Sequence, residues 1–372
     1  MMTPASSILA STLLLLGTLA PTTEALPSVS LSSRASTCNG HSELCNKQYS
    51  NVTYVGAHNS YAIGNGLSNV AANQDQPIAT QLNAGVRMLQ AQAHQSSNSS
   101  SASGISLCHT SCGLLDGGTL ENWLSQVKTW LDSNPNEVLS LLLVNSDNLP
   151  PATFAKAFDA AQMTSLMYQP GSAASSSGGI AKNAWPTLQD MISSGKRVVG
   201  YLASGADLSS VNYLLPEFSS IWENAYDQTT SGPFNCTIDR SGQGEDTSSQ
   251  MYLANFFKAN SLGSLGTVPD TSAIYTTNAE QNILQSAYSC ASQHGNVAPT
   301  FILVDYYDRP QGDVFAAAAQ LNGVAYSNST SQGSSASSSK DSSSSSGSAA
   351  MRPVTVGTGA LGVAAAALAL LV

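Results

Sequence analysis

The sequence predicts an α/β protein whose main domain, residues 38–326, folds as a TIM-type (β/α)8 barrel, either regular or irregular. Two observations favour this fold. Short apolar runs alternate with amphipathic segments along the domain, as in a parallel sheet covered by helices. The domain also has roughly 290 residues, a size that suits such a barrel. A sandwich or a doubly wound sheet would show similar runs, so the pattern alone leaves both alternatives open.

Strands are expected where short apolar runs occur between turn-forming residues. We predict strands at residues 52–57, 86–92, 105–109, 138–145, 197–203 and 300–305, with weaker signals at 222–226 and 252–257.

Helices are expected where apolar residues recur at helical spacing. Residues 119–134 are the clearest candidate, because Thr119 can cap the helix and one face is apolar. We interpret this face as core rather than as a ligand site; it consists of Leu120, Trp123, Leu124, Val127, Trp130 and Leu131. Further helices are predicted at 152–161, 187–194, 279–292 and 313–321, and a loop at 171–179.

The amino-terminal end is typical of a secretory signal. Residues 8–19 form a short apolar core, and small residues follow up to Ala25, so residues 1–25 are predicted to be a signal peptide and 26–37 an N-terminal segment. A transmembrane anchor is the alternative, but a dozen apolar residues are too few to span a bilayer.

The carboxyl-terminal end predicts a surface anchor. Residues 327–350 are rich in serine and are expected to form a solvated stalk. Residues 351–372 end in an apolar run, which is typical of a GPI-attachment signal. We therefore expect an extracellular protein, attached through a GPI anchor to the plasma membrane or cell wall. A tail-anchored transmembrane helix is the alternative.

Six cysteines agree with an oxidising compartment. We predict disulfides between Cys38 and Cys45, Cys108 and Cys112, and Cys236 and Cys290. A zinc cluster around Cys108 and Cys112 is the alternative, and it lacks a second Cys/His pair nearby. N-glycosylation sequons begin at Asn51, Asn98, Asn235 and Asn328.

The formal net charge of −10 argues against a nucleic-acid partner. It also excludes tight binding to anionic lipids through bulk charge. We expect a monomer without a cofactor.

Two histidines follow apolar runs and are the main candidates for chemistry. One lies in Tyr54-Val-Gly-Ala-His58-Asn59-Ser-Tyr61, and the other in Leu107-Cys-His109-Thr-Ser-Cys112. Two imidazoles at strand ends can act as general base and general acid, as cleavage of a phosphodiester by an internal hydroxyl requires.

The first of these motifs resembles the opening active-site segment of the phosphatidylinositol-specific phospholipase C (PLC) superfamily, which has a TIM-barrel fold. Residues 85–145 are also similar to secreted fungal members, and the resemblance covers most of 45–320. It implies that His58 takes a proton from the inositol 2-hydroxyl, and that His109 protonates the leaving oxygen or stabilises the transition state. It further implies that Asp305, at the end of the last strand, orients His58. We expect all three residues at the carboxyl rim of the barrel.

The second strand departs from the family pattern. Gln90 and Gln92 stand where calcium-dependent members have carboxylates and calcium-independent bacterial members have an aspartate and an arginine. A divalent cation held by neutral amides should bind poorly, so no metal is expected. The missing charge could come from His94 at acidic pH or from Arg309, or Asn59 and the amides could replace it as hydrogen-bond donors. His94 is preferred because strand alternation places it on the same face as Gln90 and Gln92. Asn145, at another strand end, is a further candidate for the pocket lining.

These observations predict a cell-surface, metal-independent PLC-like phosphodiesterase that acts on an inositol phospholipid or a related phosphodiester. A barrel that has lost turnover and acts as a binding or wall-associated protein is the second hypothesis. A magnesium-dependent sphingomyelinase D-type or glycerophosphodiesterase enzyme is the third, and it needs a carboxylate pair on the second strand that the chain lacks.

Overall fold

The structure is a computed structural model that describes residues 34–64, 69–96, 101–109, 112–226, 228–229, 233–261 and 267–326. The predicted signal peptide, serine-rich stalk and GPI signal lie outside these residues, as do the sequons at Asn98 and Asn328. Asn51 and Asn235 are exposed, which makes both accessible for glycosylation. Their glycosylation stays a prediction. Among the helices of the described residues, none is long and apolar enough to cross a membrane.

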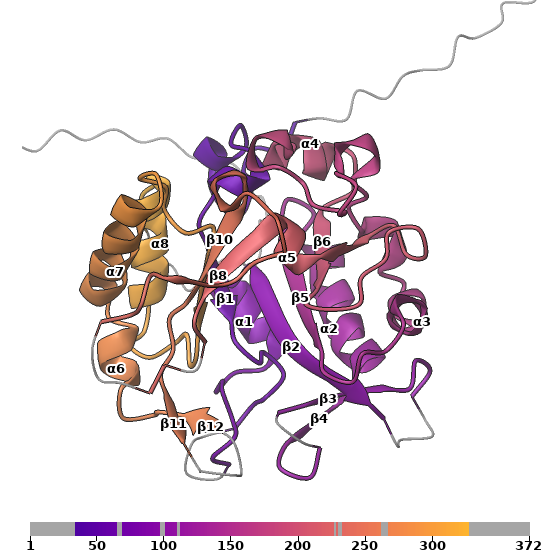
Figure 1. Cartoon of the computed structure of the whole chain (residues 1–372), viewed down its shortest axis with the longest axis horizontal. Coiled ribbons are helices and arrows are strands. Elements are labelled where there is room, and N and C mark those ends of the chain that lie inside the picture. The colour runs from indigo at the N-terminus through magenta and orange to yellow at the C-terminus, as the bar shows by residue number, and fades with distance from the viewer. Residues whose placement is uncertain are drawn as a thin grey trace, which may run out of the picture. The chain divides into compact units, whose positions relative to one another are not determined.

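A curled parallel sheet forms the centre of the domain (Figure 1). Neighbouring strands follow the order β7-β6-β5-β2-β1-β13-β10-β8, and each ladder between them is parallel. No ladder joins β7 to β8 within the described ranges, so the barrel is open there. This confirms the predicted TIM-type barrel in its irregular form. The strands are β1 Tyr54–Ala57, β2 Met88–Gln95, β5 Leu139–Asn145, β6 Val198–Leu202, β7 Leu214–Pro216, β8 Ile221–Asn224, β10 Met251–Asn255 and β13 Phe301–Val304.

Antiparallel strands extend this sheet at its carboxyl end. β3 (Ile105–Cys108) pairs with the end of β2 and with β4 (Asp116–Thr119), and β9 (Ile238–Arg240) pairs with β8. A separate hairpin joins β11 (Ala259–Ser261) to β12 (Thr267–Pro269). The hairpins β3–β4 and β11–β12 lie at the same end of the domain (Figure 1). The strand predicted at 105–109 is therefore part of a hairpin and not one of the parallel strands of the barrel.

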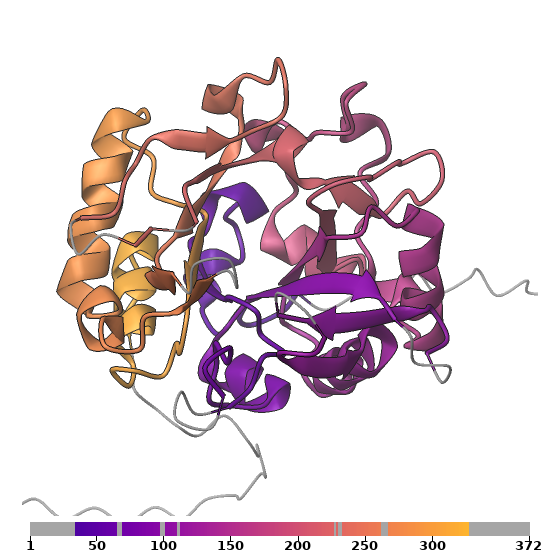
Figure 2. The same cartoon turned by 60° about the horizontal axis from the view of Figure 1, so that its bottom comes forward.

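Helices cover the outer face of the sheet. Figures 1 and 2 show α7 and α8 side by side on one flank and α2 and α3 on the other. The five predicted helices are confirmed within one or two residues, whereas α1, α5 and α6 were not predicted. The helices are α1 Ile78–Ala84, α2 Leu120–Ser133, α3 Pro151–Ala160, α4 Leu188–Ser193, α5 Glu217–Ser220, α6 Ile274–Thr277, α7 Glu280–Gln293 and α8 Asp313–Asn322. Short 3-10 turns lie at Ser42–Leu44, Tyr49–Asn51, Thr164–Leu166, Gly171–Ala173, Lys182–Ala184 and Thr247–Ser249.

Helix α2 shows how local sequence sets these elements. Thr119 precedes the helix, and its side-chain oxygen accepts a hydrogen bond from the backbone N–H of Asn122 at 3.3 Å. The predicted apolar stripe is fully buried, including Trp123 and Trp130. The stripe is therefore core, as its helical spacing indicates.

The sheet separates two apolar cores. Met88 packs inside the barrel with Leu142 and Leu303, whereas the next residue, Leu89, packs outside against the helices. Toward the amino end the interior is closed by large side chains such as Tyr49, whose hydroxyl lies 2.5 Å from that of Ser140. The carboxyl end is thus the side on which a polar site can form.

A buried polar cluster lies at the opening between β7 and β8. Glu217 follows β7 and is 1% exposed, and Glu223 of β8 is 2% exposed. Arg240 forms an ion pair with Glu223, and Asn255 donates a hydrogen bond to it at 3.2 Å. Burial, together with the charge and hydrogen bond of Glu223, raises the pKa of Glu217 well above its usual value of 4.5. The fold therefore favours the protonated form of Glu217 over the ionised form.

Glu217 should make stability depend on pH. Because its pKa is raised in the folded state, its stabilising contribution is full below its unfolded pKa and is lost as pH rises through the folded pKa. The free energy of unfolding should fall with rising pH, by at most about 1.4 kcal/mol per pH unit from this group. Glu217→Gln should flatten this slope in urea unfolding measured between pH 6 and 9. The exposed Glu43, whose pKa is lowered, provides the control Glu43→Gln, which should leave the slope unchanged. An equal slope in Glu217→Gln and the native chain would contradict the assignment.

Candidate active site

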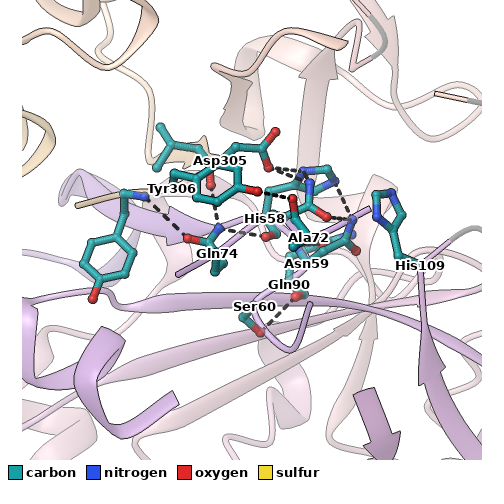
Figure 3. A network of polar contacts seen from close by, with 12 residues as sticks. His58, Asn59, Ser60, Ala72, Gln74, Gln90, His109, Asp305 and Tyr306 are labelled. Carbon is teal, nitrogen blue, oxygen red and sulfur yellow. Dashed lines mark hydrogen bonds and ion pairs between the residues drawn. The ribbon is translucent and has the colours of Figure 1, made fainter. Parts of the chain in front are cut away.

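His58 lies directly after β1 and is held on several sides (Figure 3). Its backbone N–H donates to the carbonyl oxygen of Val304, which continues the ladder between β1 and β13. Its Nδ1 lies 2.8 Å from Oδ1 of Asp305, and its ring stacks on Phe257 with centroids 4.0 Å apart and planes 7° apart. The imidazole is thus fixed by an ion-pair partner at one edge and by an aromatic face.

These contacts determine which nitrogen of His58 carries the proton. A carboxylate only accepts hydrogen bonds, so Nδ1 is the nitrogen that donates to Asp305. In the neutral ring Nε2 is then the free base, and it accepts from Nδ2 of Asn59 at 3.2 Å. Asp305 is 3% exposed, and its Oδ1 also accepts from Nδ2 of Asn73 at 2.8 Å. The contacts thus assign Nδ1 as the donor nitrogen of His58 and Nε2 as its acceptor nitrogen.

A frame of buried amides positions this pair. The backbone N–H of Asn59 donates to Oε1 of Gln90 at 2.6 Å, and its Nδ2 donates to Oδ1 of Asn73 at 3.2 Å. Asn59 has a φ of 41°, a left-handed conformation that asparagine tolerates better than most residues. Nε2 of Gln74 donates to the carbonyl oxygens of His58 and Val304 at 2.8 and 3.1 Å. Asn59 is fully buried, so it supports His58 from below instead of lining an open surface.

His109 completes the site from another element. It follows β3, and its ring centroid lies 6.4 Å from that of His58 with the planes at 78°. Its Nδ1 donates to the carbonyl oxygen of Ala71 at 2.5 Å, which leaves Nε2 as the second titrating atom. Burial and the charge of His58 lower the pKa of His109 below its usual value of 6.5, although the hydrogen bond to Ala71 opposes this. A disulfide joins Cys108, the residue before this histidine, to Cys112.

His109 reaches the rim by a route that the sequence did not predict. Residues 105–109 were expected to form a parallel strand that ends at the rim, but β3 runs antiparallel to β2, with Leu107 opposite Ala93. β2 extends beyond the barrel, and β3 returns along this extension. The return carries His109 back toward His58.

The cation candidates have carboxylate partners. Nδ1 of His94 lies 3.3 Å from Oδ1 of Asp147, and the guanidinium of Arg309 lies 2.5 Å from the carboxylate of Asp75. His94 is also four residues beyond Gln90 on β2, which is roughly 13 Å further along the strand. The expectation that either residue supplies a free positive charge is therefore not supported by these contacts.

Asn145 braces its own loop. Its Nδ2 donates to the carbonyl oxygens of Leu149 and Ser204 at 2.9 and 3.2 Å, and its Oδ1 accepts from the N–H of Leu149 at 2.8 Å. These hydrogen bonds use both donors and one acceptor position of the side-chain amide. We therefore assign Asn145 a structural role instead of the predicted pocket lining.

The donor set fits a divalent cation poorly. Gln90 accepts from Asn59, and the one carboxylate beside His58, that of Asp305, is engaged by His58 and Asn73. Oδ1 of Asn59 has no hydrogen-bond partner in the described part of the chain, but a single neutral oxygen is a weak ligand. The described residues contain no group of three or more His, Cys, Asp or Glu side chains placed to hold a metal.

Three supporting residues were missed in the sequence: Asn73, Gln74 and Phe257. The polar run from Asn73 to Gln76 precedes helix α1 and could have marked a functional loop. Phe257 carries no such signal, because a phenylalanine after an apolar strand predicts core.

Comparisons with known proteins identify the family. The family described as PI-PLC X 1 matches residues 44–322. The chain belongs to the PI-PLC X family. A PI-PLC X domain-containing protein 1 from the fungus Arthroderma benhamiae is 36% identical over 291 residues, covering 77% of this chain and 90% of that protein.

A second relative of this PI-PLC X family protein is an uncharacterized secreted protein from Arthroderma benhamiae, 38% identical over 299 residues. That match covers 78% of this chain but 65% of the relative. Solved structures of phosphatidylinositol-specific phospholipase C are also similar. The Listeria monocytogenes enzyme has a TM-score of 0.49 at 13% identity, covering 74% of this chain and 94% of that chain. An F249X mutant from Staphylococcus aureus has a TM-score of 0.47 at 15% identity, covering 76% and 95%.

The three predicted disulfides are present: Cys38–Cys45, Cys108–Cys112 and Cys236–Cys290. The alternative of a zinc cluster at Cys108 and Cys112 is therefore wrong.

Proposed function

We propose that this PI-PLC X family protein is a metal-independent phosphodiesterase in which His58 is the general base and His109 the general acid. The observation that carries the proposal is the pair of imidazole rings 6.4 Å apart, one of them oriented by Asp305 at 2.8 Å. A phosphodiester between the two rings would place its attacking and leaving oxygens on opposite sides of phosphorus, one at each histidine.

The reaction then runs in one displacement. Nε2 of His58 takes the proton from a hydroxyl next to the phosphate, and this oxygen forms a bond to phosphorus. The bond between phosphorus and the leaving alcohol breaks, and the protonated Nε2 of His109 gives its proton to the departing oxygen. The products are a cyclic phosphate and a free alcohol. Asp305 stabilises the imidazolium that forms at His58.

Positive charge at the phosphate comes from His109 in this proposal. Its protonated ring would stabilise the negative charge that develops on the phosphorane. It would thus replace the metal ion or arginine of other family members, because Gln90 and Gln92 are neutral and neither carry a positive charge nor bind a cation well. The proposed substrates are inositol phospholipids or related phosphodiesters. The predicted signal peptide, serine-rich stalk and GPI anchor would place this reaction at the outer cell surface.

Product analysis tests the proposal. The purified protein should convert phosphatidylinositol to diacylglycerol and a water-soluble inositol cyclic phosphate, at equal rates with and without a chelator. Products are measured by phosphorus NMR. Stimulation by Ca²⁺ or Mg²⁺ would contradict the metal-independent mechanism. No product from phosphatidylinositol or other phosphodiesters would instead favour a binding protein on the same barrel.

A further inference from the structure

A cavity outside the candidate active site lies on the flank of the barrel that carries α6 and α7. Its volume is about 540 Å³, and the residues that touch it come from the segment after β8, the β11–β12 hairpin and these two helices. Among them are Phe234, Lys258, Asp270, Thr276, Ser286 and Ser289. The lining includes neither His58 nor His109.

Lys258 is the unusual residue of this cavity. It is 7% exposed, and its Nζ lies 4.4 Å from the ring centroid of Phe234. Within the described ranges Nζ has no hydrogen-bond partner and forms no ion pair. Burial lowers the pKa of Lys258. An ammonium group without a counter-charge is costly to bury, and an aromatic face offsets only part of that cost.

A carboxylate lines the same cavity directly after β12. Asp270 lies directly opposite Lys258, since its backbone N–H donates to the carbonyl oxygen of Lys258 at 2.9 Å. Its Oδ1 accepts from the N–H and the hydroxyl of Ser272 at 3.1 and 2.5 Å. Hydrogen bonds from Ser272 lower the pKa of Asp270, so it stays ionised. The two opposite charges nevertheless form no ion pair with each other within the described ranges, and both residues line a cavity of about 540 Å³.

We propose that this cavity binds a small zwitterion, with a phosphate group at Lys258 and an ammonium group at Asp270. Phosphoethanolamine has this chemistry, either as a free compound or as a phospholipid headgroup. The lysine side chain is long and flexible, so its ammonium can turn from the ring of Phe234 toward a phosphate oxygen. The hydroxyls of Thr276, Ser286 and Ser289 are available as further donors to that phosphate.

Calorimetric titration of the full chain with O-phosphoethanolamine, inorganic phosphate and ethanolamine tests the proposal. The zwitterion should bind at least about tenfold more tightly than either half, because it makes both charge-assisted contacts and each half makes one. Lys258→Met and Asp270→Asn should each weaken binding by about tenfold or more. Lys156→Met, at an exposed lysine of α3, and His109→Ala should leave the affinity unchanged.

Three outcomes would overturn the proposal. They are no saturable binding, equal binding of phosphate alone with no effect of Asp270→Asn, and loss of binding in His109→Ala, which would place the ligand in the active site. Because Lys258→Met could disturb folding, its thermal unfolding is compared with that of Ser286→Ala, which should also weaken binding. Sedimentation with phosphatidylethanolamine or phosphatidylcholine vesicles separates the two sources. Selective, Lys258-dependent binding to phosphatidylethanolamine identifies the headgroup as ligand, and binding of the soluble compound alone identifies a free zwitterion.

Discussion

Replacement of His58 or His109 by alanine should lower the turnover of phosphatidylinositol by about 10²- to 10⁴-fold, the usual contribution of a general acid or base. The two losses should differ in their dependence on the leaving group. An alkyl alcohol needs a proton as it departs, whereas a nitrophenolate does not. His109→Ala should therefore recover, on a nitrophenyl ester of inositol phosphate, the part of its activity that depends on protonation of the leaving group, whereas the part that depends on positive charge at the phosphate stays lost. His58→Ala should stay inactive on both substrates.

The pH profile provides a second signature of these variants. Because burial and His58 lower the pKa of His109, its acid form is lost as pH rises through a value below 6.5. In the native chain, kcat/KM should accordingly decrease with rising pH already in the acidic range, as His109 loses its proton. His109→Ala should not show this decrease. The control is His41→Ala, since His41 lies next to the 3-10 turn Ser42–Leu44, before β1. Full activity of His58→Ala on phosphatidylinositol would contradict the proposed mechanism.

Asp305→Asn should lower kcat by about 10- to 10³-fold with little change in KM. The amide oxygen of the substituted side chain can still accept from Nδ1 of His58, so the geometry is kept while the negative charge that stabilises the imidazolium is lost. Asp305→Ala should cost more, because the ring then also loses the partner that keeps the proton on Nδ1.

Proton NMR separates these two contributions. The downfield Nδ1–H resonance of His58 should persist in Asp305→Asn and disappear in Asp305→Ala. Asp308→Asn is the matched control, because this nearby carboxylate accepts from Nε2 of Gln76 at 3.2 Å and does not contact His58. Unchanged kcat in both Asp305 variants would show that Asp305 only supports the fold.

Local patterns in the sequence predicted much of the fold. The apolar runs at 52–57, 138–145 and 300–305 became β1, β5 and β13, and the helical stripe at 119–134 became α2. These predictions succeeded because burial on one face is encoded by residue spacing within a single element. β7 and α1 were missed, since each is short and lacks a clear period of its own.

The main residues of the site were predicted from the sequence, but the contacts that hold them in place were not. His58, His109 and Asp305 were named from the sequence, and the structure brings all three together. The partners of His94 and Arg309 could not be predicted, because Asp147 and Asp75 are far from them in sequence and lie in other loops. The stacking of Phe257 on His58 could not be predicted from the sequence either, because it depends on the pairing of β10 with β13.

The amino-acid sequence by itself determined most of the longer strands and helices, which cysteines can pair and which histidines are candidates for acid–base chemistry, because these depend on residue type and short-range spacing. Only the tertiary structure decided that the barrel is open between β7 and β8, that a hairpin returns His109 to His58, and that Asp147 and Asp75 lie beside His94 and Arg309. Those features depend on strand pairing between segments that are distant in the sequence. Which side chains become neighbours is decided only when the strands of the sheet have paired in register.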